Sequence, residues 1–174
     1  VKGKERRIGS PGIYAAFDQS PNDDYVLVER IEQPFSYLVP YDDFPTSVEV
    51  WDPSGKRLKQ LALIPAKENL PQGFDSVVTG PRNFAWRADA PATLVYVVAQ
   101  DGGDMKKDTA IHDRVFTLSA PFNAEPQALL DLSMRFGDIT WGNDAIALVS
   151  EWRYGDRQTR TSKFSPSSPM EARV

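Results

Sequence analysis

Two runs of strand-forming residues, joined by a long loop, occupy the segment between residues 20 and 61. They read Ser20-Pro-Asn-Asp-Asp-Tyr-Val-Leu-Val28 and Ser47-Val-Glu-Val-Trp-Asp-Pro-Ser-Gly-Lys-Arg-Leu-Lys-Gln-Leu61. The Asn-Asp-Asp at 22–24 favours a turn, because short Asn and Asp side chains bond the local backbone. The valines of the second run alternate with polar residues, at the period of a half-buried strand. Pro-Ser-Gly at 53–55 predicts a hairpin to a further strand.

The rest of the chain repeats this unit loosely. A preceding strand is predicted at 13–17, and Trp86 and Trp141 occupy matching positions in two later units. Self-similarity over a long interval is typical of propeller and solenoid repeats. We therefore predict an all-β fold, a partial β-propeller of about three blades built as antiparallel four-stranded meanders. The expected boundaries of the units are 13–61, 84–130 and 138–164.

Composition excludes several classes of site. The chain has 174 residues, a net charge of -4 and no cysteine, so neither a disulfide nor a thiolate metal site can form. The acidic balance argues against a nucleic-acid partner, and no apolar run reaches the roughly 20 residues that a membrane span needs. Because the chain starts at Val1 without an initiator Met, it is interpreted as a fragment of a longer polypeptide with its catalytic domain elsewhere.

Long loops are predicted on one face of the blades. In a four-stranded meander the loop between the second and third strands lies on the same face in every blade, and here these loops span 29–46, 100–112 and 151–158. Long loops on a rigid scaffold commonly carry binding residues, and aromatic side chains are favoured at interfaces. The candidate contacts for a peptide substrate or a covering domain are Phe35, Tyr37, Tyr41, Phe44, Trp152, Arg153 and Tyr154. The same aromatic residues also fit a loop that simply packs on its blade.

No catalytic, cofactor or metal residue is predicted. A hydrolase nucleophile needs Gly-x-Ser-x-Gly on a strand-to-helix elbow, and the chain lacks this motif. His112 is the only histidine, and without a paired nucleophile it is interpreted as a polar residue between a loop and a strand. The Asp-Gly-Gly-Asp at 101–104 lacks the alternating oxygen ligands of a calcium loop and indicates a turn.

A family resemblance rests on residues 33–52. The run Pro34-Phe-Ser-Tyr-Leu-Val-Pro-Tyr41, followed by Phe44-Pro45 and Val48-Glu-Val-Trp-Asp52, resembles the propeller of the glutamyl endopeptidase branch of the prolyl oligopeptidase family. Supporting pieces occur along nearly the whole chain, such as Trp86-Arg-Ala-Asp-Ala-Pro-Ala92. The resemblance implies a serine peptidase in which an N-terminal propeller covers a C-terminal α/β-hydrolase domain and screens substrates by size.

This resemblance predicts a non-catalytic propeller segment that gates and positions peptide for the α/β-hydrolase domain of the same polypeptide. The family's catalytic residues all belong to that domain, so none is carried over to this chain. A periplasmic or secreted location is expected, with cytoplasmic and organellar locations left open. Two alternatives remain: a stand-alone TolB-like binding module without enzymatic activity, and an oligomer that associates through open sheet edges.

Overall fold

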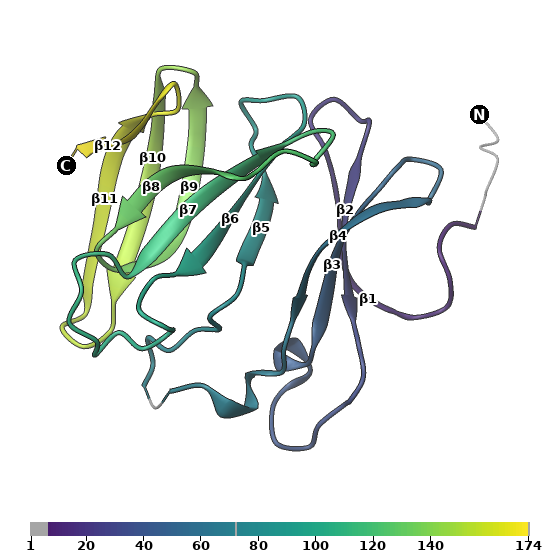
Figure 1. Cartoon of the computed structure of the whole chain (residues 1–174), viewed down its shortest axis with the longest axis horizontal. Coiled ribbons are helices and arrows are strands. Elements are labelled where there is room, and N and C mark those ends of the chain that lie inside the picture. Colours follow the sequence, from purple (N-terminus) through teal and green to yellow (C-terminus); the bar gives the residue numbers. More distant parts are fainter. Residues whose placement is uncertain (1–6, 72, 174) are drawn as a thin grey trace.

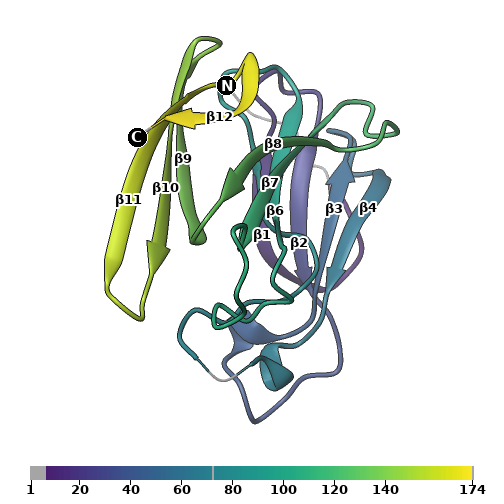
Figure 2. The same ribbon diagram turned by 60° about the vertical axis from the view of Figure 1, so that its left-hand side comes forward.

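The computed structural model describes residues 7–71 and 73–173, and these form three antiparallel sheets of four strands each. The sheets stand side by side in chain order (Figures 1 and 2). Blade 1 contains β1 (Ile13–Gln19), β2 (Val26–Ile31), β3 (Thr46–Trp51) and β4 (Arg57–Ile64). Blade 2 contains β5 (Arg82–Trp86), β6 (Thr93–Ala99), β7 (Asp113–Ser119) and β8 (Gln127–Leu132). Blade 3 contains β9 (Arg135–Asn143), β10 (Ile146–Arg153), β11 (Gln158–Ser165) and β12 (Ser168–Arg173).

The predicted all-β partial propeller is confirmed, with strands paired consecutively in each sheet. The sheets are longer than the sequence units. β4 continues to Ile64, β9 begins at Arg135, and β12 adds a fourth strand beyond residue 164. Pro169 stands within β12, which lies at a sheet edge, where proline is tolerated.

An apolar layer joins blade 1 to blade 2. Val48 and Val50 on β3 are fully buried, and they belong to one cluster with Leu94 and Leu118 of blade 2. Phe122, in the turn between β7 and β8, closes this layer and contacts Trp86 with ring centroids 6.0 Å apart. The alternation of apolar and polar residues in the sequence thus places one face of each strand between two sheets.

A second apolar layer joins blade 2 to blade 3. Val97, Val115 and Leu130 of blade 2 pack with Val149 and Phe164 of blade 3, all at most 2% exposed. Burying such a side chain stabilises the fold by about 1.5–3 kcal/mol. The two layers therefore hold the three sheets face to face, as blades of a propeller are held.

The only helical segments among the described residues are two 3₁₀ turns. They are η1 (Tyr41–Asp43), in the loop between β2 and β3, and η2 (Lys67–Asn69), in the connection between β4 and β5. Within the described ranges, no helix has the length and apolar character needed to cross a membrane.

Candidate functional site on the long-loop face

Four chain segments meet on one face of the three sheets, called here the long-loop face. They are the β2–β3 loop (32–45), the β6–β7 loop (100–112), the β10–β11 turn (154–157) and the connection from β4 to β5. All four lie at the lower edge of Figure 1. The opposite face carries turns of two to seven residues, and the loop predicted at 151–158 is only a four-residue turn at 154–157, because β10 extends to Arg153 and β11 begins at Gln158.

A buried ion network anchors this face. Arg135, at the start of β9, is 1% exposed. Its Nη2 donates to Oδ2 of Asp101 at 2.6 Å, and its Nη1 donates to Oδ1 of Asp113 at 2.9 Å. Arg82, at the start of β5, donates from Nη2 to the other oxygen of Asp113 at 2.5 Å. Two buried carboxylates therefore neutralise two buried guanidinium groups, as burial of charge requires.

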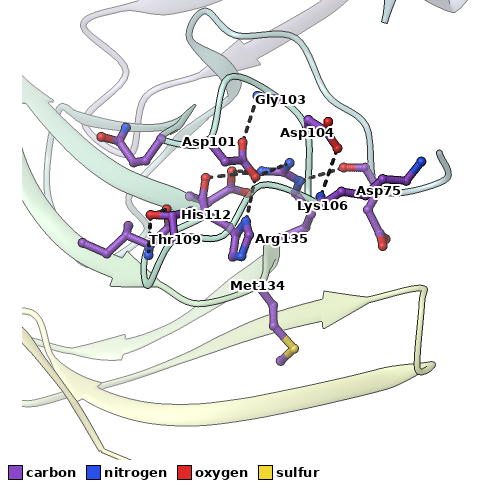
Figure 3. Close-up of polar contacts among 12 residues, drawn as sticks. Asp75, Asp101, Gly103, Asp104, Lys106, Thr109, His112, Met134 and Arg135 are labelled. Atoms are coloured by element: carbon purple, nitrogen blue, oxygen red, sulfur yellow. Dashed lines mark hydrogen bonds and ion pairs between the residues drawn. The ribbon is translucent and has the colours of Figure 1, made fainter. Parts of the chain in front are cut away.

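Asp101 has two further partners (Figure 3). Its Oδ2 lies 2.7 Å from Nδ1 of His112, and its Oδ1 accepts the backbone N–H of Gly103 at 2.8 Å. Burial opposes ionisation of Asp101, but the hydrogen bonds from His112 and Arg135 outweigh this effect and lower the pKa of the carboxyl. The loop therefore turns inward around a charged side chain, which its turn-like sequence did not indicate.

The β4–β5 connection is fastened to loops of blades 2 and 3. Arg135 donates from Nε to the backbone oxygen of Asp75 at 2.7 Å, and the backbone N–H of Tyr154 donates to Oδ1 of Asp75 at 2.8 Å. Val77 donates its backbone N–H to the oxygen of Gly103 at 3.2 Å. Residues 75–77 of the connection are thus held against blades 2 and 3, because their backbone groups and the Asp75 carboxylate find partners there.

An apolar pocket opens beside this contact. The rings of Phe74 and Tyr154 lie 4.2 Å apart between centroids, and both side chains remain exposed, at 75% and 43%. With Met105, Lys106 and Arg153 they line a pocket of about 330 Å³. Exposed aromatic rings beside a pocket are suited to contact with another protein segment.

A larger pocket of about 540 Å³ lies between blade 1 and the other two blades. Phe44 of the β2–β3 loop, Phe136 of β9 and Trp152 of β10 contribute to its wall. Arg82 and Arg135 line it as well. This pocket brings together side chains from sequence segments more than 100 residues apart.

The structure places the candidate contact residues in three groups. Phe35 stacks on Phe44, with centroids 5.6 Å apart, and Phe44 shares the larger pocket with Trp152. The other two loop aromatics point into solvent, because Tyr37 is fully exposed and Tyr41 is 71% exposed. The third group, Arg153 and Tyr154, lines the apolar pocket. The fully exposed Tyr37 does not pack on the blade, whereas Phe44 does.

Sequence reasoning missed Phe74, Asp75 and the buried arginines. Phe74 stands in a connection rich in proline and glycine that was interpreted only as irregular, and its aromatic character was the available indication. No local sequence pattern indicated that Arg82 and Arg135 would be buried, because their aspartate partners lie 22 to 34 residues away in sequence.

The described residues do not assemble a hydrolytic centre. His112 is 8% exposed, and its Nδ1 is engaged by Asp101. Among the residues that the structure describes, no group of three or more His, Cys, Asp or Glu could hold a metal ion.

Acid is expected to weaken the fold through Asp101. A carboxyl whose pKa is lowered by folding stabilises the protein above its unfolded pKa, and this stability is lost as the pH falls through the folded pKa. The unfolding free energy measured with urea should therefore fall steeply below about pH 4. Asp101→Asn should lose more stability at pH 7 than at pH 3, and an equal loss at both values would contradict this assignment. Asp131→Asn, in the surface pair with Arg114, is the control.

Known proteins are similar to this chain over nearly its whole length. No family model matches the chain. Over 170 residues it is 40% identical to the protein named "Probable glutamyl endopeptidase, chloroplastic" of Arabidopsis thaliana. The chain is similar to a segment of glutamyl endopeptidases. The protein of the same name from Oryza sativa subsp. japonica is 39% identical over 166 residues.

These matches span 97% and 94% of the chain but only 18% of each glutamyl endopeptidase. The predicted resemblance to glutamyl endopeptidases is confirmed, and the chain corresponds to a small, all-β part of proteins named as peptidases. The names of both relatives place them in the chloroplast. Nothing in these names supports the expected periplasmic or secreted location.

Proposed function

We propose that the chain is a non-catalytic propeller segment of a serine peptidase of the prolyl oligopeptidase type. Its long-loop face contacts a separate α/β-hydrolase domain and positions peptide at the entrance to that domain. The observation that carries the proposal is the match of nearly the whole chain to 18% of proteins named glutamyl endopeptidase. The shared chloroplast naming favours an organellar location.

The geometry of the face supports this role. The Arg135 network and the Asp75 contacts hold the β6–β7 loop, the β4–β5 connection and the β10–β11 turn together, so the exposed Phe74 projects from a fixed base. A contact surface preorganised in this way loses less conformational entropy when a partner binds. A gate that excludes large substrates needs the same rigidity.

Sequencing the reading frame beyond Val174 tests the assignment. A continuation with further blades and an α/β domain that carries Gly-x-Ser-x-Gly supports the proposal. A stop codon soon after Val174 contradicts it and favours the stand-alone TolB-like module, for which sizing chromatography then distinguishes a monomer from an oligomer.

In the full polypeptide, Tyr37→Ala is expected to change peptide hydrolysis without changing stability. Tyr37 is fully exposed, so its loss should alter the unfolding free energy by no more than about 0.5 kcal/mol. We expect a several-fold change in kcat/KM for long peptides and little change for a short ester, because only long substrates reach the gate. Tyr37→Phe keeps the ring and serves as the matched control. Equal effects of Tyr37→Ala on both substrates would contradict a gating contact.

A further inference from the structure

The larger pocket contains a carboxylate that has no partner. Glu29, on β2, lines this pocket and is half-buried. Among the described residues its carboxylate forms neither a hydrogen bond nor an ion pair. Burial raises the pKa of Glu29. An unpaired carboxylate at a half-buried position is destabilising, and a cation in the pocket would stabilise it.

The uncompensated charge around the pocket is negative. Arg82 and Arg135 are neutralised by the buried carboxylates described above. Lys67 is paired with Asp43, with Nζ and Oδ1 2.5 Å apart. Asp42 also lines the pocket and has no hydrogen bond or ion pair among the described residues. Two carboxylates therefore remain available to a positively charged group.

The aromatic wall suits the same kind of ligand. Phe44, Phe136 and Trp152 come from three different elements and line the pocket. A cation near an aromatic face is attracted to the ring, most strongly when it is removed from water. An ammonium group on an aliphatic stem would use both the rings and the carboxylates.

Arg82 supplies a second unsatisfied group. Its side chain is 10% exposed, and its Nη1 is buried without an acceptor in the described part of the chain. A buried donor without a partner is destabilising. A small rotation of the Arg82 side chain would bring this donor to the pocket, where a carbonyl oxygen of a ligand could accept from it and remove that cost.

From this geometry we infer that the larger pocket binds a primary ammonium group of a peptide, with Glu29 as its main partner and a neighbouring peptide carbonyl directed toward Arg82. The ammonium belongs either to a lysine side chain or to a free amino terminus. A volume of about 540 Å³ accommodates a residue of either kind. The inference concerns a pocket contained within this chain and holds whether or not the chain belongs to a peptidase.

Titration of the ¹⁵N-labelled chain, followed by NMR, tests the inference. N-acetyl-lysine amide presents a side-chain ammonium, and glycinamide presents a terminal one. We expect at least one of them to shift the Trp152 indole and Glu29 amide signals in a saturable manner, and their relative affinities identify the source. Nε-acetylation of the lysine probe should abolish binding, because it removes the charge.

Glu29→Gln should weaken ammonium binding at least about tenfold, the effect of losing a charged hydrogen-bond partner. Its thermal unfolding temperature should not fall, since the substitution removes an unpaired charge. Glu125→Gln, at an exposed position outside this pocket, should bind as the unsubstituted chain does. Asp42→Asn provides a second test, and we expect it to lower the affinity for the ammonium probe less than Glu29→Gln does.

Three results would overturn the inference: equal affinity in Glu29→Gln, signal changes that map outside the pocket, or no saturable change with either ammonium probe. A titration with sodium acetate at matched ionic strength tests whether the pocket binds an anion instead. Saturable binding of acetate in place of the ammonium probes would assign the pocket to an anion held by Arg82.

Discussion

Gly103→Ala is expected to destabilise the folded chain by at least about 3 kcal/mol, enough to lower the unfolding midpoint markedly in a urea titration. Gly103 has a φ of +82°, a conformation that L side chains rarely adopt. A Cβ at this position would lie 2.1 Å from the backbone oxygen of Val77. The same oxygen belongs to the β4–β5 connection, so relief of the overlap would also displace that connection from blade 2.

The neighbouring Gly102 provides a control with nearly the same backbone conformation. Its φ is +73°, but a Cβ there would meet no atom within 4 Å. Gly102→Ala should therefore cost only the left-handed backbone term of about 1–2 kcal/mol. If both substitutions cost the same, the close approach of Gly103 to Val77 does not contribute to stability.

Arg135→Met is expected to cost about 3–5 kcal/mol, because it leaves the buried Asp101 without its guanidinium partner and Asp113 with only Arg82. It also removes the hydrogen bond to the backbone of Asp75. The substitution retains most of the aliphatic volume, so the loss reports charge and hydrogen bonding more than packing. The loss is a large part of the stability of a typical domain, and chemical denaturation at pH 7 measures it.

Arg114→Met supplies the comparison at the surface. Arg114 also pairs with an aspartate, Asp131, but the two side chains are 30% and 23% exposed. Solvent screening limits such a pair to about 1 kcal/mol or less. Arg135→Lys should recover part of the loss, because it keeps the charge without the planar fork of donors. A cost for Arg135→Met as small as that for Arg114→Met would show that the buried network does not hold the face together.

Local sequence pattern was sufficient for most of the strands, but it did not reveal β12 or the ion network. The alternation around Val48 and the β-branched run from Thr93 to Ala99 predict strands because each strand lies between two apolar layers. The position of the long loops follows from the meander topology alone. The pairing of Arg135 with Asp101 depends instead on how blades 2 and 3 meet, which no local pattern encodes.

The binding residues were predicted in part for the same reason. Aromatic composition identified Phe44, Trp152 and Tyr154, which the structure places at two pockets. It did not distinguish the packed Phe44 from the solvent-exposed Tyr37, since both stand in one loop of similar composition. The sequence also did not indicate that Glu29 would lack a partner among the described residues, because this depends on which side chains the neighbouring blades place around it.

The fastening of the β4–β5 connection also bears on how copies of the chain could exchange parts. Domain swapping would require one copy to give up blade 1 and accept that of a neighbour, with the connection acting as a hinge. Such a hinge must first release Asp75 from Arg135 and Tyr154, and Val77 from Gly103. These polar contacts therefore oppose the release of blade 1 from its own chain.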